Sequence, residues 1–407
     1  MLPNPSFVVP HQFVTTQPQL EKFCARLRDA DRIGFDTEFV SEDTFRPQLC
    51  LVQVATADEL AVIDPLGEAD DSPGLDMTPF WRVLADGDHI TIAHAAREEI
   101  NFSLTAIDAP PANLFDTQLA AAFCSTDYPA AYSSVVSRFV GHRLKKGEQR
   151  TDWRRRPLSD AQIDYALEDV RHLLKLHDVI GAKIDKRERR SWFDEDTHEF
   201  VAEVTAARTR ERWRKVSGIG NLQARGLAIV RELWRWRQSE AKQRDIPPKR
   251  VLRDDLMVEL AKRKNADVQK IRAVRGMQYA SVKKALPAIA ECVQRGLDAN
   301  LDDLQQRSRR PSPPQLNLLG QFLAPAITSV CQGAGIAASL VGTATDIREL
   351  IAYRLEYATD DGPPSLASGW RADFIGRLIE ELLAGNKSLR IVNPKGDDPI
   401  VIDDVGE

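Results

Sequence analysis

Cysteine is scarce in this chain of 407 residues, and neither glycine nor proline is enriched. The five cysteines, Cys24, Cys50, Cys124, Cys292 and Cys331, are scattered and form no Cys-x-x-Cys pair. Such usage is typical of a reducing compartment, and it disfavours a disulfide framework and a cysteine-based zinc site. With 22 Gly, 23 Pro and 43 % hydrophobic residues, the composition excludes a collagenous, low-complexity or wholly disordered chain.

Long hydrophobic runs are also missing. The longest apolar stretches, such as 49–56, are far shorter than the ~20 residues that a helix needs to cross a bilayer. The N-terminal sequence MLPNPSFVVPHQF has no basic segment followed by a continuous hydrophobic one, so we expect no secretory signal. The sequence therefore predicts a cytoplasmic protein without a membrane-spanning helix.

Acidic and basic residues are distributed unevenly along the chain. Residues 1–200 contain 22 Lys and Arg against 34 Asp and Glu, whereas 201–300 contain 23 against 11 and 301–407 contain 10 against 15. The length fits two or three domains of roughly 100–200 residues each. The charge pattern indicates an acidic domain followed by a basic one that could hold a polyanion, although an ordinary solvated helical surface is the alternative.

Short β-rich runs dominate the first hundred residues. Four of them are bounded by turn or charge signals: 32–39, 49–55, 59–66 and 89–95. Helical periodicity then follows in three places: 116–124, about 130–140 and 160–182. We expect a layered α/β or α+β domain with strands first and helices later. Ser159 and Gln162 form a capping-box pattern, which predicts that a helix begins there.

The strand signal disappears after about residue 183. A charged connecting helix is expected over 183–215, and amphipathic segments over 216–297 describe a small helical bundle. The sequence RSRRPSPP (307–314) is too rich in proline to continue a helix and predicts a linker. Residues 315–395 are again mainly helical, and we expect the helical pattern to include the stretch SGWRADFIGRLIEELLAGNKSLRI (368–391).

Two carboxylates interrupt an apolar strand in the sequence Phe35-Asp36-Thr37-Glu38-Phe39. Asp36 and Glu38 are two residues apart, so both side chains project from one face of the sheet. Like charges this close raise each other's pKa unless a cation neutralises them, and Mg²⁺ or Mn²⁺ is the usual cation for oxygen ligands. The alternative is a pair of strand-end carboxylates that face water.

A second acidic motif lies on the capped helix. Tyr165 and Asp169 are four residues apart, so their side chains lie on one helix face. A carboxylate there can hold a metal while the neighbouring phenol hydrogen-bonds a water bound to that metal. The alternative is a helix with Tyr165 in the core and Asp169 in solvent near His172.

A third acidic motif occurs in the sequence HAAREEI (94–100), at an expected junction of strand and helix. It supplies Glu98 and Glu99. Acidic residues in the first turn of a helix also complement the helix dipole, which is the alternative explanation. We expect His94 to be structural, because it lies at an apolar strand end with no second ligating histidine nearby.

Together, these three acidic motifs, ended by Tyr-x-x-x-Asp, resemble the ribonuclease D group of DEDDy 3′→5′ exonucleases. The resemblance also covers DTQLAA (116–121) and KGEQRTDWRRRPLS (146–159), and it spans roughly residues 10–200. The helical block from about 209 to 297 is similar to an HRDC domain, and 315–395 looks like a diverged second one.

The fold class that this resemblance implies is an α/β ribonuclease-H-like exonuclease domain followed by all-α HRDC-type helical domains. The expected organisation is an exonuclease domain over 1–208, an HRDC domain over 209–298, a linker over 299–314 and a diverged second HRDC-like domain over 315–407.

The resemblance also implies a catalytic site. Its members are Asp36, Glu38, Glu99, Tyr165 and Asp169. The four carboxylates would hold two divalent metal ions, Mg²⁺ or Mn²⁺, for a two-metal hydrolysis of phosphodiester bonds, and Tyr165 would orient the attacking water. The family has Asp where this chain has Glu99, and the extra methylene can change the metal spacing or the activity.

An acidic site repels a polyanion, so the basic region 201–300 is the expected source of affinity for nucleic acid. The side chains expected to contact phosphates are Arg212, Arg214, Lys215, Arg225, Lys249, Arg250, Lys262, Arg263 and Lys264. Trp213, Trp234 and Trp236 lie among them and could stack on bases, but packing in the helical core is the favoured interpretation.

By the resemblance, the chain is expected to trim RNA 3′ ends, particularly those of tRNA precursors, and to release nucleoside 5′-monophosphates. No membrane and no obligate protein partner are expected. Two alternatives stay open. One is a catalytically impaired nucleic-acid-binding protein in which the Glu99 site no longer holds two ions, and the other is a DNA-directed 3′→5′ exonuclease.

Overall fold

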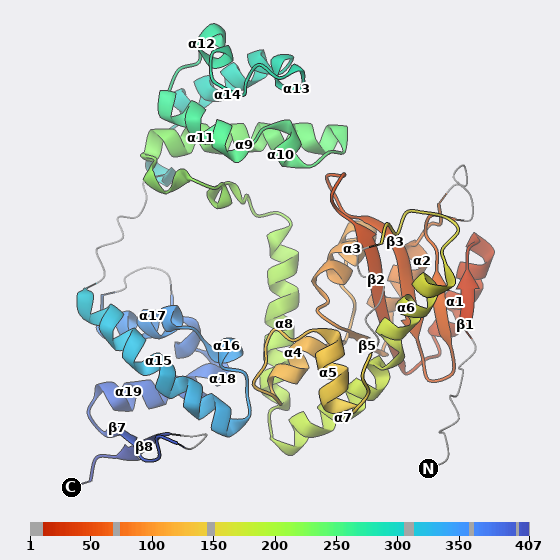
Figure 1. The fold of residues 1–407 in the computed structure, drawn as a ribbon, viewed down its shortest axis with the longest axis vertical. Coiled ribbons are helices and arrows are strands. Elements are labelled where there is room, and N and C mark those ends of the chain that lie inside the picture. Colours follow the sequence, from red (N-terminus) through yellow and green to blue (C-terminus); the bar gives the residue numbers. More distant parts are fainter. Residues whose placement is uncertain are drawn as a thin grey trace.

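A mixed six-stranded sheet forms the centre of the N-terminal domain (Figure 1). The computed structural model describes residues 11–67, 74–144, 151–304, 313–357, 362–395 and 399–406. The strands of the sheet are β1 (His11–Val14), β2 (Arg32–Val40), β3 (Gln48–Ala55), β4 (Leu60–Ile63), β5 (Ile90–Ala93) and β6 (Leu114–Asp116). Their order is β1-β4-β3-β2-β5-β6. β3 is antiparallel to both of its neighbours, and the other pairs are parallel.

Helices cover both faces of this sheet. Three helices, α1 (Gln17–Leu27), α2 (Thr78–Asp86) and α3 (Arg97–Ile107), cover one face, where Phe35 of β2 is buried together with Phe80 and Trp81 of α2. The opposite face buries Leu51 and Ile92 beneath α4 (Thr117–Ala122), α5 (Tyr132–Phe139), α6 (Asp160–Arg171) and α7 (Leu173–Lys186). Side chains alternate between the two faces along each strand, so even-numbered residues of β2 face α6 and α7.

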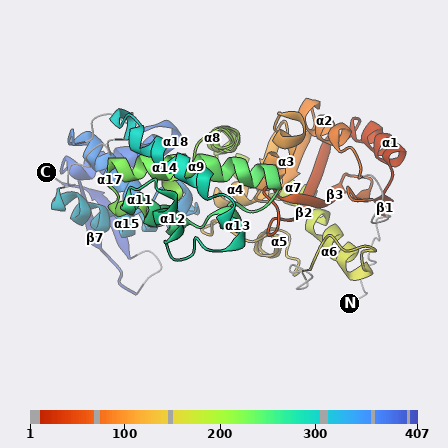
Figure 2. The ribbon, with the colours of Figure 1, turned by 90° about the horizontal axis from the view of Figure 1, so that it is seen from above.

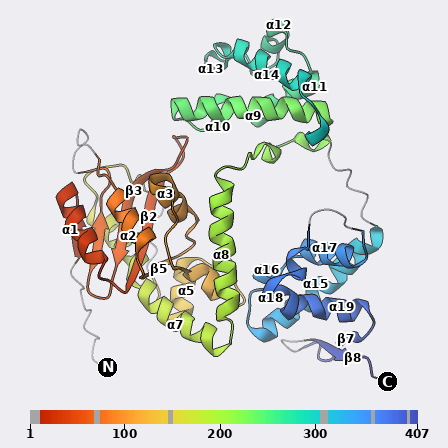
Figure 3. The same ribbon diagram turned by 180° about the vertical axis from the view of Figure 1, so that it is seen from behind.

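A long helix, α8 (Arg190–Ala207), comes after α7 (Figure 3). Phe193 near its beginning belongs to the core beneath α4 to α7, and Val204 near its end belongs to the core on the other face of the sheet. The helix therefore packs on the N-terminal domain along its length while it carries the chain toward the helical regions.

The first helical domain has a core of its own, whose buried members all lie between Trp213 and Leu304. Its elements are η1 (Trp213–Lys215), η2 (Ile219–Asn221), α9 (Ala224–Arg244), α10 (Pro248–Val251), α11 (Asp254–Arg263), α12 (Val268–Arg272), α13 (Ala280–Lys283), α14 (Leu286–Asp298) and η3 (Asp302–Leu304). Seen from above in Figure 2, α9 runs along the domain with α14 beside it.

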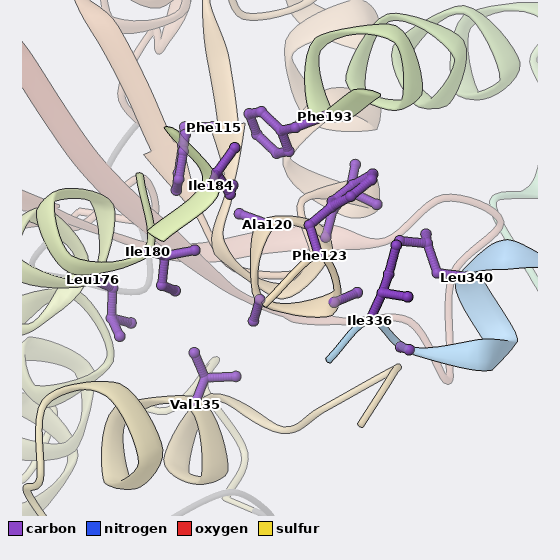
Figure 4. Packing of buried hydrophobic residues seen from close by; sticks show 14 of the residues in the cluster. Phe115, Ala120, Phe123, Val135, Leu176, Ile180, Ile184, Phe193, Ile336 and Leu340 are labelled. Carbon is purple, nitrogen blue, oxygen red and sulfur yellow. The ribbon is translucent and has the colours of Figure 1, made fainter. Parts of the chain in front are cut away.

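The C-terminal domain shares a core with the N-terminal domain. Its elements are α15 (Pro314–Ala334), α16 (Ala338–Val341), α17 (Ala344–Arg354), η4 (Ser365–Ala367), α18 (Gly369–Arg371), the π-helical turn η5 (Ala372–Gly376), α19 (Arg377–Leu383), β7 (Lys387–Ile391) and β8 (Ile400–Asp404). Figure 4 shows Ile336 and Leu340 of this domain beside Phe123 of the N-terminal domain, in one continuous cluster.

The structure confirms an α/β domain followed by mainly helical regions, with local differences. The prediction that strands come first and helices later was wrong, because α1, α2 and α3 alternate with the strands. The helix expected over 160–182 is interrupted at His172. The tail of 368–391 was expected to be helical, but Gly385 adopts a positive φ of 78° and β7 follows, paired with β8.

Two expected features lie wholly or largely outside the described residues, namely KGEQR (146–150) and most of the proline-rich linker (305–312). Within the parts of the chain that the structure describes, none of the helices combines the length and the hydrophobicity needed to cross a bilayer.

Candidate active site

Asp36 and Glu38 lie on the face of β2 that is covered by α6 and α7. They precede a register shift between Glu38 and Phe39, where the pairing of β2 with β3 becomes irregular. Neither carboxylate is a freely solvated strand-end group, because burial is the largest influence on the pKa of each. The solvent-facing alternative is therefore not the arrangement that the fold adopts.

Glu99 lies in the first turn of α3 and is only 5 % exposed. Its carboxylate accepts a hydrogen bond from the Thr37 hydroxyl at 2.7 Å. Since Thr37 lies between Asp36 and Glu38 on β2, this contact brings the third acidic motif against the first. Helix-dipole complementarity alone does not account for a first-turn carboxylate that is buried against a strand.

The turn before α3 is held by Asp116 at the end of β6. Its carboxylate accepts hydrogen bonds from the backbone N–H groups of Ala95 at 3.1 Å and Ala96 at 2.9 Å. The same side chain caps α4 through the N–H of Gln118 at 2.8 Å. Asp116 thus fixes the direction in which α3 leaves the sheet, and this explains the DTQ sequence in physical terms.

Asp169 lies on α6, where Tyr165 one turn earlier donates a hydrogen bond to its carboxylate. The helix begins as predicted, since the Ser159 N–H donates to Gln162 Oε1 at 3.0 Å and the Gln162 N–H donates to Ser159 Oγ at 3.3 Å. The preceding segment is anchored by the buried Arg156, whose Nη2 donates to Asp64 at 2.6 Å.

A glycine on β2 allows α7 to approach this strand closely. Gly34 lies two residues before Asp36 on the same face, and a Cβ atom built on it would lie 3.1 Å from Cβ of Leu173 and 3.1 Å from Cδ1 of Leu174. Such a contact is tighter than ordinary van der Waals packing. The bare backbone at this position allows α7, which carries both leucines, to lie close to the acidic strand.

The four carboxylates interact electrostatically. Burial raises the pKa of Asp36 well above its usual range, and the neighbouring carboxylates raise it further, Glu99 most strongly. Burial, followed by Asp169 and Glu99, raises the pKa of Glu38 to about 8. Burial also raises the pKa values of Glu99 and Asp169 to about 7 each. Residues far apart in sequence are thus gathered in one poorly solvated acidic cluster.

This cluster fits divalent cations. Buried carboxylates with raised pKa values gain most from a positive charge between them, and an all-oxygen ligand set suits Mg²⁺ or Mn²⁺. Gln53, paired in register with Asp36, is fully buried, and neither atom of its side-chain amide has a hydrogen-bond partner. A hydrated cation beside Asp36 would supply polar partners for such an amide.

Sequence reasoning missed several residues that shape this site. Nothing in the sequence marks Thr37 or Gln53 as a site residue, and only the pairing of the strands places them beside the acidic residues. Tyr132 bonds the end of α6: its hydroxyl donates to Glu168 O at 3.4 Å and accepts from His172 N–H at 3.3 Å. His94 is structural, as expected, because its two ring nitrogens contact Thr117 Oγ1 and Ala130 O.

The basic residues of the first helical domain differ in their surroundings. Arg225 donates to two backbone carbonyl groups of its own domain, whereas Arg250 forms an ion pair with Asp43 of the N-terminal domain at 2.6 Å. Arg263 pairs with Glu259 on its own helix. The others are exposed: Arg212, Arg214, Lys215, Lys249, Lys262 and Lys264. Trp213 is buried, and Trp234 and Trp236 pack against the core, as the favoured interpretation expected.

Comparison with known proteins gives matches for both parts of this architecture. A family model described as 3′-5′ exonuclease matches residues 11–185, and the HRDC domain model matches residues 226–293. The first match contains all five expected site residues. The second falls within the helical domain that has its own core.

Curated relatives match over nearly the whole chain. A ribonuclease D from Acidiphilium cryptum is 34 % identical over 96 % of this chain and 97 % of its own length, and one from Nitrobacter hamburgensis is 31 % identical over 93 % and 96 %. The crystal structure of Escherichia coli RNase D, titled an exoribonuclease involved in structured RNA processing, is similar with a TM-score of 0.77 and 27 % identity, over 92 % of this chain and 99 % of that one. The chain therefore belongs to the ribonuclease D family and is a 3′→5′ exoribonuclease in which a nuclease domain precedes an HRDC domain.

Proposed function

We propose that this enzyme shortens RNA from its 3′ end by a hydrolysis that depends on two divalent ions, Mg²⁺ or Mn²⁺, and that its site consists of Asp36, Glu38, Glu99, Tyr165 and Asp169. One observation carries the proposal: carboxylates from β2, α3 and α6 raise one another's pKa in a poorly solvated cluster, with a phenol bonded to one of them.

The residues have distinct roles. Asp36, the central carboxylate of the cluster, would contact both ions, while Glu38 and Asp169 would hold the ion nearer the attacking water. Glu99 would help to hold the other ion. When bound, the ions neutralise the carboxylates and stabilise the charge on the attacking and leaving oxygens.

Tyr165 orients the nucleophile. Its hydroxyl donates to Asp169 in the structure, and burial raises the pKa of this phenol, so it keeps its proton at neutral pH. A water beside the phenol attacks the terminal phosphorus. The P–O3′ bond breaks, the shortened strand keeps a 3′-hydroxyl, and the last nucleotide leaves as a nucleoside 5′-monophosphate.

The HRDC domain lies where it can deliver RNA to this site. Two residues of the HRDC domain contact the loop that follows the acidic strand. Arg250 pairs with Asp43 of this loop, and Asp245 accepts a hydrogen bond from the Phe45 N–H at 3.1 Å. Exposed lysines and arginines of this domain would bind phosphates without regard to sequence. Arg225 is the weakest candidate among them, since its guanidinium already donates to carbonyl groups.

The natural substrates that we propose are structured RNAs with 3′ extensions, tRNA precursors in particular, in the cytoplasm. This proposal is supported by the family and by the Escherichia coli relative, which is an exoribonuclease involved in structured RNA processing. Specific recognition of RNA depends on contacts with the 2′-hydroxyl, so the choice between RNA and DNA needs a direct measurement.

The decisive experiment follows 5′-labelled RNA carrying a 3′ extension, with Mg²⁺, Mn²⁺ or a chelator, for the wild type and Asp36→Asn. The wild type should release mononucleotides stepwise only with metal. The variant should lose more than about 10²-fold in rate, since even the outer partner of a metal ligand is worth about 10–100-fold. It should keep its fold and its affinity for RNA.

Two outcomes would overturn the proposal. Undiminished turnover by Asp36→Asn would remove this cluster from the chemistry. RNA binding by the wild type without release of mononucleotides would favour an impaired binding protein, the alternative raised by Glu99. A matched DNA strand, degraded faster than the RNA, would instead favour the DNA-directed alternative.

A further inference from the structure

A second cluster of potential metal ligands lies beside the catalytic helix and plays no part in the proposed hydrolysis. It contains His142, Glu168 and His172, whose ligating atoms all lie within 4.8 Å of one another. Glu168 and His172 are four residues apart at the end of α6, so they share one side of the helix. His142 comes from the segment after α5.

The distances from each histidine to Glu168 are close to those between two ligands of a tetrahedral ion. Nε2 of His172 lies 3.1 Å from Glu168 Oε1, and Nε2 of His142 lies 3.7 Å from the same oxygen. Two ligands that each lie about 2.0–2.1 Å from a tetrahedral Zn²⁺ are about 3.3 Å apart, which falls between these two distances. The His142 and His172 rings lie 4.9 Å apart, at an angle of 39°.

The donor set differs in kind from that of the catalytic cluster. Two imidazoles and one carboxylate select zinc and similar transition metals, whereas Mg²⁺ prefers oxygen ligands alone. Glu168 keeps one oxygen free of histidine contacts, and Arg171 pairs with that Oε2 at 3.2 Å. The arrangement thus resembles a ligating carboxylate that is itself held by a neighbouring donor.

The site is open to solvent on one side. The His142 side chain is 54 % exposed, whereas those of Glu168 and His172 are 30 % and 15 % exposed. Three protein ligands with one accessible side leave a position for water, as in three-ligand zinc sites. A metal ion held by these three ligands would join the segment after α5 to the junction of α6 and α7. One of the ligands, Glu168, is adjacent to Asp169 in the sequence.

We propose that His142, Glu168 and His172 form a transition-metal site of the Zn²⁺ class, separate from the catalytic carboxylates, which fixes the end of the catalytic helix. This site is distinct from the proposed hydrolysis. The two can be tested separately, because metal binding can be measured on a variant that has no catalytic turnover.

The test is a calorimetric titration of the full chain with Zn²⁺, in saturating Mg²⁺ and in an Asp36→Asn background, which weakens binding at the catalytic cluster. One equivalent of Zn²⁺ should bind. His142→Ala should lower the affinity by more than about 10-fold, since loss of a ligand exceeds the 10–100-fold cost of losing an outer partner only. His198→Ala, which removes an exposed histidine of α8, is the matched control.

Two further measurements make the result decisive. Co²⁺ bound in place of Zn²⁺ should give the visible absorption of a tetrahedral nitrogen-ligated site, and His142→Ala should abolish it. Zn²⁺ should also raise the melting temperature of the parent protein but not that of His142→Ala. The proposal is overturned if Zn²⁺ does not bind, or if His142→Ala and His198→Ala bind it equally, because the cluster would then be only a surface ion pair.

Discussion

The two helical regions that follow the nuclease domain are attached to it in opposite ways. The HRDC domain has a separate core and meets the nuclease domain through exposed polar groups, such as the pair between Arg250 and Asp43. The C-terminal domain continues the nuclease core and adds a buried ion pair, in which Arg371 contacts Asp196 at 2.7 Å and 2.8 Å. Trp370 donates to the same carboxylate at 2.8 Å.

This difference separates two tasks. A shared apolar core and a paired buried charge resist separation, because parting them would expose apolar surface and leave a charge unpaired. Exposed ion pairs contribute little and weaken with salt. We therefore expect the nuclease and C-terminal domains to behave as one catalytic body and the HRDC domain to move more freely.

The largest expected effect breaks the buried interface. Asp196→Asn leaves Arg371 without its charged partner, and loss of one member of a buried pair costs about 3–5 kcal/mol. Urea denaturation, followed by far-UV circular dichroism, should show a much lower midpoint for the catalytic body. Asp43→Ala, the control at the HRDC contact, should leave the midpoint nearly unchanged. Equal losses would contradict the proposed difference between the two attachments.

A second substitution sharpens the separation of chemistry from binding. Tyr165→Phe removes the hydroxyl that orients the water, so kcat should fall by about 10²-fold, the lower end of the contribution of a positioned proton-handling group. The affinity for RNA, measured by fluorescence anisotropy, should stay the same. An unchanged kcat would exclude Tyr165 from the mechanism.

The third expectation concerns pH, and it applies to the catalytic body alone. The pKa values of Glu38 and Asp169 are raised to about 8 and about 7 in the metal-free fold, whereas unfolded carboxyls titrate near about 4. The folded state then binds more protons, so their stabilising contribution is complete below about pH 4 and is lost as the pH rises through 7 to 8.

In a chelator, urea denaturation at pH 5 to pH 8 should therefore show a steeper loss of stability for the wild type than for Glu38→Gln. Added Mg²⁺ should reduce the loss at pH 8. Parallel pH profiles of the two proteins would show that Glu38 does not carry the expected shift.

The smallest effect should come from single basic residues of the HRDC domain. Lys249→Ala or Lys262→Ala should weaken RNA binding a few-fold and reduce the slope of log affinity against log salt by about 0.7, the share of one contact with a single-stranded phosphate. Lys22→Ala on α1 is the control. If all three variants bind alike, the phosphate contacts lie elsewhere.

The sequence predicted the residues of the candidate site better than their geometry. Strand alternation placed Asp36 and Glu38 on one face, and the capping box located the start of the helix of Asp169. Neither pattern could show that Glu99 reaches Thr37, because that contact depends on the pairing of β2 with β5 and on the turn held by Asp116. Long-range packing of this kind leaves no periodic signal.

The domain interfaces were the least predictable feature of the fold. The expectation of two similar helical domains gave no reason to predict that one would share the nuclease core, since Ile336 and Leu340 look like the apolar residues of any helical domain. The β7–β8 hairpin was missed because its short strands follow a strong helical pattern directly. Which apolar face meets which partner is decided by the assembled fold.

The bare backbone at Gly34 has a consequence for how such enzymes diverge. A single methyl group there would press on Leu173 and Leu174 of α7, the helix that directly follows the helix of Asp169. In the proposed site, the spacing of the carboxylate oxygens would thus depend on a position that supplies no ligand. A substitution at such a spacer would change the geometry of the cluster while every acidic residue stays in place.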